Sequence, residues 1–297
     1  DVLTPSTVTE SSNVKKCVSS SSITDSSNIQ SSSTICTWCK QPTLKIPLCV
    51  NCSTYKQDHM FRFILERLRT AAGKGFQTLQ EECNRMTPIV DSYPVIFNPI
   101  EYVDPTDKHY PKDTAAQSYL DKYCEKEWQS YIPVQVAGDG NCFYNSFIKL
   151  SPSLNMTPTE LRTRNVLELV KNSSIYRKQY ENLPVCLDHL EKYVTTEMVI
   201  DTVYSSVWDI LSITNVLNIR LTIVYPKVNG NSDKIASSLN KTFSPISNGQ
   251  PKHDVVLMFS SCSKECISPK LEKAWMPNHF VPLLRIRSNI NFHGENF

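Results

Sequence analysis

The sequence VAGDGNCFYNSF at residues 136–147 decides how the rest of the chain is interpreted, because it places a cysteine where a turn should become a helix. Residues 132–136 are a short β-prone run, and the two glycines that follow supply turn chemistry. Phe143 and Phe147 then recur at the i, i+4 spacing of a helix face. The pattern predicts that Cys142 lies at or near the N-terminus of a helix.

A cysteine in that position has the chemistry of a nucleophile. The unpaired backbone N–H groups and the helix dipole favour a thiolate, so we expect the pKa of Cys142 to be lowered. A thiol with its ordinary pKa of about 8.5 is only a few per cent ionised near pH 7, whereas a drop of about two units ionises most of it. The glycines also let the backbone approach a substrate carbonyl, so that N–H groups of the loop could hold an oxyanion.

The run Asp139-Gly140-Asn141-Cys142 resembles the signature of the ovarian tumour (OTU) family of cysteine proteases, in which Asp-Gly-Asn-Cys opens a helix. The family places its histidine well downstream, ahead of a hydrophobic strand, and the sequence NHFVPLL at residues 278–284 stands at that place. Its His-Phe-Val-Pro-Leu segment is most similar to the Cezanne branch of the family. The resemblance covers residues 128–287.

The resemblance implies an α+β, papain-like fold in which a central mixed sheet carries His279, helices pack on either side, and Cys142 opens one of them. It also implies a thiol-dependent deubiquitinase that hydrolyses isopeptide bonds at the ubiquitin C-terminus. Cys142 would attack the carbonyl, and His279 would act first as base and then as acid. The implied partner is ubiquitin or a polyubiquitin-modified protein, and no cofactor is required for catalysis.

The residue that orients the histidine is where the sequence departs from the family pattern. Many OTU proteins have Asp or Asn two residues after the histidine, and here that position is Val281, which accepts no hydrogen bond. Asp139 is the alternative that matches the motif of the Cezanne-like branch, and Asn278 is a second candidate. Loss of the orienting acid costs as much as about 10⁴ in rate in a serine protease. A catalytically weak or inactive OTU-like domain that binds ubiquitin or another protein is therefore the second hypothesis.

The strand that should carry the histidine contains a proline. In an extended chain His279 and Val281 point to one face, and Phe280 and Pro282 point to the other. Because Pro282 cannot donate to a strand ladder, the sequence predicts an edge strand or a bulge, with His279 near solvent.

Four other cysteines have the spacing of a metal site: Cys36, Cys39, Cys49 and Cys52. Four thiolates in two Cys-x2-Cys knuckles can close a tetrahedral zinc site, which predicts a structural zinc module over residues 35–56. The module is distantly similar to the small ubiquitin-binding zinc fingers that some OTU proteins carry. It lacks their Trp-x-Cys entry and has nine residues between the knuckles where ten is usual, so a spacer, a protein contact or a DNA contact are alternatives.

The remaining segments have simpler compositions. Residues 1–34 are rich in Ser and Thr and have no aromatic residue, which predicts a disordered tail. Residues 57–127 should form two helices, the second ended by Pro88, and then a proline-rich connector. Residues 128–290 form the predicted catalytic domain.

Within that domain the local signals are regular. The sequence TPTE at residues 157–160 predicts a capped helix start with proline at the first helical position. Residues 196–217 predict a further helix, and residues 220–225 and 254–259 predict strands. Residues 227–251, which are polar and rich in Asn, Ser and Lys, predict a surface insertion.

Composition limits the function classes. The chain has 297 residues, is 40% hydrophobic and 20% charged, and has a formal charge of +2, as expected for a globular protein with one substantial domain. No long basic run is present, so a DNA-associated protein is the least favoured interpretation. No apolar run reaches the length of a membrane span. Eleven cysteines without a secretory signal predict zinc and free thiols in an intracellular protein of the cytoplasm or nucleus.

Overall fold

The computed structural model describes residues 33–35, 42–44, 50–152, 156–180, 182, 189–228, 237–246, 249–262, 275 and 277–287. The chain divides into two compact units, Asp1–Cys49 and Val50–Phe297. In the first unit β1 (Ser33–Ile35) pairs antiparallel with β2 (Pro42–Leu44).

The predicted zinc ligands lie almost entirely outside the described residues. Cys36, Cys39 and Cys49 are not described, and for Cys52 only the backbone is described, near the start of α1 (Val50–Ala72). The zinc module and the disordered tail therefore stay predictions.

The second unit is an α+β domain with a mixed sheet, as predicted. Its strands run in the order β3-β8-β7-β5-β6, and β4 also pairs with β8. Parallel pairing joins β5 to β7, whereas β7 and β8 are antiparallel. The strands are β3 (Tyr102–Val103), β4 (Tyr131–Pro133), β5 (Ile219–Val224), β6 (Thr242–Phe243), β7 (His253–Ser260) and β8 (His279–Ile286).

The strand that begins with His279 is central, so the prediction of an edge strand is wrong. The first half of β8 pairs with β7, and its second half pairs with β4 on the opposite side. Pro282 fits because it lacks only a donor, while its carbonyl accepts a hydrogen bond from the Val134 N–H at 2.9 Å. His279 is buried, with 3% of its surface exposed, instead of lying near solvent.

Alternate residues of β7 and β8 pack against helices on opposite faces of the sheet. Met258 and Val281 belong to the hydrophobic cluster that holds Tyr119 of α3 (Thr114–Tyr123). Phe280 faces the other way, with its ring centroid 5.2 Å from that of Phe143 in α4 (Cys142–Leu150). The strand that carries His279 is thus fixed between two helices.

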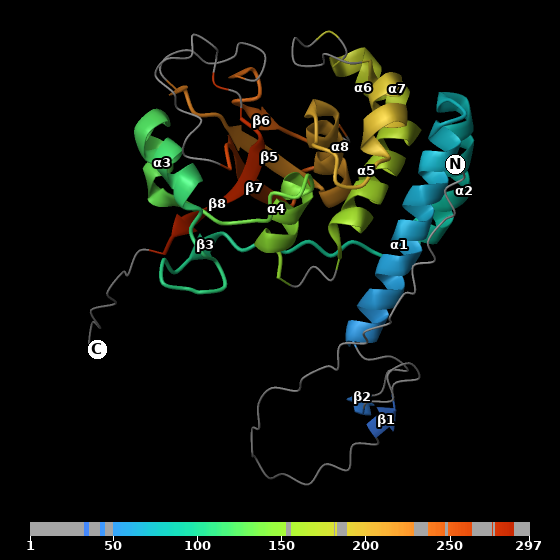
Figure 1. The fold of residues 1–297 in the computed structure, drawn as a ribbon, viewed down its shortest axis with the longest axis horizontal. Coiled ribbons are helices and arrows are strands. Elements are labelled where there is room, and N and C mark those ends of the chain that lie inside the picture. The colour runs from blue at the N-terminus through green and yellow to red at the C-terminus, as the bar shows by residue number, and fades with distance from the viewer. Residues whose placement is uncertain are drawn as a thin grey trace, which may run out of the picture. The chain divides into compact units, whose positions relative to one another are not determined.

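The helices α1 and α2 (Phe76–Asp91) form a hairpin that packs on α5 (Pro158–Lys171). In Figure 1, α5 lies between the sheet and this hairpin. Two helices are present, as predicted, and the break between them falls at residues 73–75. Pro88 does not end α2, which continues to Asp91. Its last turn persists because Val90 is buried in the core, so packing outweighs the lost backbone hydrogen bond.

Two predictions concern the remaining helices: the start of α5 is confirmed, and the helix over residues 196–217 is not. Thr157 caps α5 by accepting from the Glu160 N–H at 3.3 Å. The single helix expected over residues 196–217 is wrong, because a π-helical turn, η2 (Val194–Met198), and residues 199–206 separate it from α8 (Val207–Leu217). Ser206 caps α8 in a capping box with Asp209. The other helical elements are η1 (Lys126–Ser130), a 3-10 helix, α6 (Ser173–Tyr180) and α7 (Leu190–Tyr193).

The predicted polar insertion is partly ordered where it is described. Thr242 and Phe243 form β6, which pairs antiparallel with Leu221 and Thr222 of β5. Asn240 adds a side-chain hydrogen bond from the Tyr225 N–H at 3.0 Å. Within the described part of residues 227–251, Thr242 and Phe243 thus add a short strand to the sheet.

Candidate active site

The helix α4 begins at Cys142, and its preceding turn is built by short polar contacts. Gly140 has a φ of 84°, a conformation that glycine adopts without strain. Asp139 Oδ1 accepts from the Asn141 N–H at 2.9 Å and from Asn145 Nδ2 at 3.0 Å. The motif aspartate therefore holds the turn that presents the cysteine.

The structure brings the start of β8 to this turn. The Phe280 N–H donates to Cys142 Sγ at 3.5 Å, although the two residues are 138 positions apart in the sequence. A Cβ atom added to Gly138 would lie 3.7 Å from His279 Cε1 and 3.8 Å from His279 Nδ1. The Nδ1 edge of the imidazole thus faces Gly138 in the loop of residues 138–142, called here the Cys loop.

Burial sets the ionisation of both side chains. Cys142 has 2% of its surface exposed, and burial raises its pKa, whereas the Phe280 and Phe143 N–H groups lower it and Asp139 raises it. Burial lowers the pKa of His279, and the charges of Asp113 and Asp139 raise it. The expected lowering of the thiol pKa is therefore wrong for this state, since desolvation exceeds the effect of the helix terminus. Both shifts favour the uncharged forms, a thiol and an imidazole, and a neutral imidazole can act as a base.

A carboxylate that the sequence reasoning missed lies on the other side of the imidazole. Asp113 Oδ2 is 3.9 Å from His279 Nε2. Its second oxygen, Oδ1, caps α3 by accepting from the Ala116 N–H at 2.8 Å, which fixes the side chain. The available signal was an aspartate directly before a helical run, and nothing in its local sequence pairs it with a histidine 166 positions away.

The two predicted candidates for orienting the ring are engaged elsewhere. Both hydrogen bonds of Asp139 go to the Cys loop and to α4, and Asn278 Oδ1 accepts from the Cys262 N–H at 3.1 Å. Asp139 acts on His279 through its charge, because it raises the pKa of the imidazole. By position, Asp113 is the carboxylate that faces Nε2, the ring nitrogen on the side away from the Cys loop.

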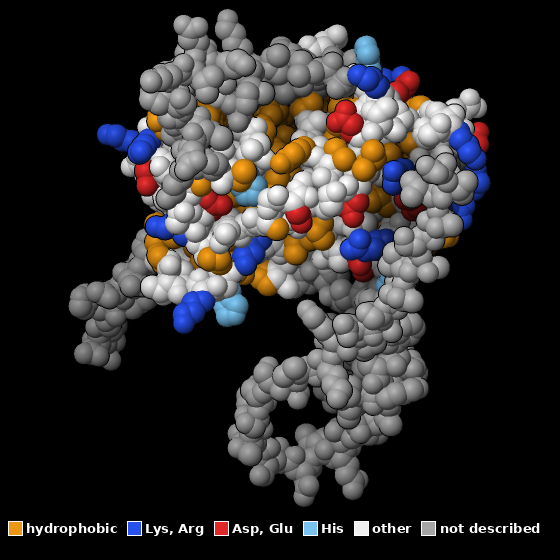
Figure 2. All heavy atoms as spheres, in the orientation of Figure 1, with side chains coloured by type: hydrophobic (Ala, Val, Ile, Leu, Met, Phe, Trp, Pro, Cys, Tyr) orange, Lys and Arg blue, Asp and Glu red, His pale blue; other side chains and the backbone are white. Residues whose placement is uncertain are grey.

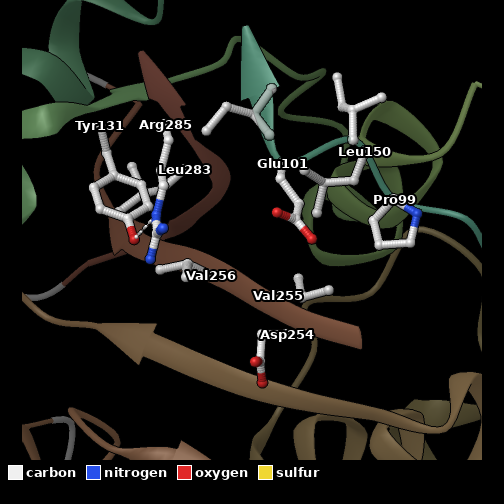
Figure 3. Close-up of a pocket in the computed structure, with 11 residues that line it drawn as sticks. Pro99, Glu101, Tyr131, Leu150, Asp254, Val255, Val256, Leu283 and Arg285 are labelled. Atoms are coloured by element: carbon white, nitrogen blue, oxygen red, sulfur yellow. Dashed lines mark hydrogen bonds between the residues drawn. The ribbon is translucent and has the colours of Figure 1, made fainter. Parts of the chain in front are cut away.

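Two cavities lie at different distances from these residues. A pocket of about 190 Å³ is lined by Glu101, Tyr131 and Arg285, and Figure 3 shows Arg285 and Tyr131 joined by a hydrogen bond of 2.8 Å. Arg285 is six residues beyond His279 on β8, about 20 Å along the strand, and neither His279 nor Cys142 lines this pocket. A hollow of about 670 Å³ is lined by Ala137 and Asn145, which flank the Cys loop.

In the part of the chain that the structure describes, we looked for metal sites, membrane-spanning helices and charged surface patches. Among the side chains that the structure describes, no cluster of three or more His, Cys, Asp or Glu could hold a metal ion. Within the same described residues, every helix is too short or too polar to cross a membrane. Figure 2 shows basic and acidic side chains interspersed on one face, with hydrophobic side chains between them.

Comparison with known proteins identifies the family. Residues 133–202 and 187–260 match, as two overlapping segments, the family model described as the OTU domain of Vertnin. The chain carries an OTU domain. The matched OTU region contains Cys142 and the Cys loop, and it ends at Ser260, the residue paired with His279 in the sheet. A search of curated proteins finds no match.

Several solved OTU structures are similar to this chain at low identity. The OTU domain of OTUD1 is 13% identical, with a TM-score of 0.38, over 57% of this chain and 95% of that one. The viral OTU domain protease of Dera Ghazi Khan virus is 14% identical, with a TM-score of 0.34, over 57% and 85%. The OTU of Hazara virus, solved bound to ubiquitin, is 18% identical, with a TM-score of 0.28, over 53% and 83%.

Proposed function

We propose that this OTU domain is a thiol-dependent deubiquitinase that hydrolyses the isopeptide bond at the C-terminus of ubiquitin. The observation that supports the proposal is the place of the His279 imidazole between the loop that carries Cys142 and the carboxylate of Asp113. The Nδ1 edge of His279 faces Gly138 in the loop that presents Cys142, and its Nε2 atom faces Asp113. A thiol, a base and an orienting carboxylate in this order are the parts of a cysteine protease.

The reaction follows from the resting ionisation. Neutral His279 takes the thiol proton, and the sulphur of Cys142 attacks the carbonyl carbon of the last ubiquitin glycine. Backbone N–H groups of the Cys loop hold the resulting oxyanion. The carbon–nitrogen bond then breaks, and His279 returns the proton to the leaving lysine amine. Water, activated by the same imidazole, hydrolyses the thioester and releases ubiquitin.

Access to the sulphur requires the ubiquitin tail to open the site. Cys142 is buried in this structure, yet Ala137 and Asn145 on either side of it line the hollow of about 670 Å³. An extended tail that enters from this hollow reaches the Cys loop first. Tail binding would thus uncover the thiol and supply the carbonyl in one step, which limits reaction with other electrophiles.

A ubiquitin probe with a C-terminal electrophile tests the proposal. We expect the wild type to form a covalent adduct, seen as a gain of the probe mass, and Cys142→Ala to form none. Cys262→Ala is the matched control, because Cys262 is an exposed free cysteine outside the site, and it should react like the wild type. An absent wild-type adduct, or one that survives Cys142→Ala, would contradict the proposal.

A further inference from the structure

The Cys loop is packed against a second segment, residues 198–203, called here the buttress. A Cβ atom added to Gly140 would lie 1.7 Å from the Thr202 carbonyl oxygen, so the two backbones are in direct contact. Thr202 itself has a φ of 63°, which is uncommon for a residue with a side chain. The shape of the Cys loop therefore depends on where the buttress lies.

One side chain of the Cys loop is held from both ends. Asn141 precedes Cys142, and only 5% of its surface is exposed. Its Oδ1 atom accepts from Arg162 Nη2 at 2.8 Å, and its Nδ2 atom donates to Asp201 Oδ1 at 3.0 Å. Both polar ends of the amide are thus used, one by α5 and one by the buttress.

Arg162 connects three elements at once. Its side chain is fully buried, and its Nη2 atom also donates to the Val203 carbonyl at 2.6 Å. The guanidinium carbon lies 4.8 Å from the centre of the Tyr144 ring, in α4. The nearest carboxylate oxygen of Asp201 is 4.0 Å away. A buried cation with these partners is costly unless every donor is satisfied, so its position is strongly constrained.

We propose that Arg162 is a positioning residue that sets the backbone N–H groups of the Cys loop for the oxyanion. The proposal rests on the deubiquitinase function proposed above. Gly140 makes the loop backbone permissive, so local sequence alone does not fix the direction of those N–H groups. Arg162 fixes it from outside by tying Asn141 and the buttress together. Its planar fork binds two acceptors at once, which a lysine ammonium cannot reproduce in the same geometry.

The helix α5 offers a matched control two residues further on. Arg164 is also buried, with 7% of its surface exposed, and it pairs with Glu160 at 2.7 Å and donates to the Tyr93 carbonyl at 2.6 Å. These partners, together with the Val90 carbonyl and the Phe61 ring, lie on α1, α2, α5 and the segment after α2, away from the Cys loop. Arg162→Lys and Arg164→Lys therefore make the same chemical change at similar burial, and only the first acts on the Cys loop.

Kinetics on a fluorogenic ubiquitin amide, at a temperature where both variants are folded by circular dichroism, form the first arm of the test. For Arg162→Lys we expect kcat to fall about 10- to 100-fold with KM within about twofold, because misplaced oxyanion donors cost transition-state stabilisation. Arg164→Lys should keep the wild-type kcat. Equal kcat values for the two variants would overturn the proposal.

Hydrogen exchange of the Cys-loop amides is the second arm, and it does not depend on catalysis. Exchange of residues 138–143 should be faster in Arg162→Lys and unchanged in Arg164→Lys. Asn141→Ala should have the same effect, and adding it to Arg162→Lys should change little further, since the two residues act as one unit. If the wild type cleaves no ubiquitin, the proposed function fails, and this arm still decides whether Arg162 holds the loop. Unchanged exchange in Arg162→Lys would contradict the positioning role.

Discussion

At the scale of single residues, the imidazole of His279 is defined by what lies on each side of it. Gly138 lies on the side of its Nδ1 edge, and Asp113 faces its Nε2 atom. Burial lowers the pKa of His279, while the charge of Asp113 raises it. The carboxylate thus has two effects that can be separated by experiment, since it orients the ring and it sets the pH at which the base is neutral.

Asp113→Asn separates these effects because asparagine is an equally good helix N-cap and preserves α3. We expect kcat/KM on a ubiquitin amide to fall by at least about 10²-fold and by as much as about 10⁴-fold. Removing a charge that raises the pKa of His279 lowers this pKa further, so the acid limb of the pH–rate profile should move to lower pH. Asp121→Asn, an exposed aspartate in the same helix α3, is the control and should move neither quantity. An acid limb that stays in place in Asp113→Asn would contradict this role.

The close approach at Gly140 gives a prediction for stability. Alanine there meets the Thr202 carbonyl oxygen at 1.7 Å and must keep a φ of 84°. We expect Gly140→Ala to lower the free energy of unfolding by more than about 2 kcal/mol, measured by urea denaturation. Gly249→Ala, where no described atom lies within 4 Å of the added Cβ, is the control and should change it by less than about 0.5 kcal/mol. Similar stabilities for the two variants would contradict this prediction and would show that the buttress can shift at little cost in free energy.

At the scale of elements, local patterns predicted what lies within one segment, and pairing between segments was missed. Phe143 and Phe147 predicted the helix of Cys142, and Thr157 predicted the start of α5, because these signals are contained in a few neighbouring residues. The central place of β8 depends on β4, a strand of three residues with too few positions to show a period. Asp113 was missed for the same reason, since its link to His279 exists only after folding.

The burial of Cys142 at the start of α4 predicts unequal reactivity among the free cysteines. Cys142 is buried with a raised pKa, whereas Cys262 is exposed. Iodoacetamide should therefore modify Cys262 first and Cys142 at least about tenfold more slowly, as followed by peptide mass spectrometry, because the thiolate is the reactive form. The ubiquitin probe should reverse this order. If iodoacetamide labels both cysteines equally fast, the site is open before ubiquitin binds.

At the scale of the whole molecule, the OTU domain follows a segment whose four cysteines have the spacing predicted for a metal site. We propose that Cys36, Cys39, Cys49 and Cys52 hold one structural zinc ion, because four thiolates with this spacing fit a closed tetrahedral site. Elemental analysis of the purified chain should find about one zinc per molecule and none in the double variant Cys36→Ser, Cys39→Ser. Cys124→Ser, a cysteine outside the motif, should keep the metal. Zinc retained in the double variant would place it elsewhere.

The double cysteine variant also tests whether the proposed reaction of the second unit depends on zinc binding by the cysteine motif. The proposed reaction uses only Cys142, His279 and Asp113, so the zinc-free chain should still form the ubiquitin adduct at a rate within about threefold of the wild type. A complete loss of adduct, with the OTU domain still folded by circular dichroism, would show that the first unit contributes to ubiquitin binding.

The central claim is that Cys142 and His279 act together as nucleophile and base, and turnover of a fluorogenic ubiquitin amide tests it most directly. We predict steady release of the fluorophore by the wild type and a loss of at least about 10³-fold in both Cys142→Ala and His279→Gln. Cys262→Ala should match the wild type. A wild type that binds ubiquitin without releasing the fluorophore, or a His279→Gln variant with wild-type turnover, would contradict the account.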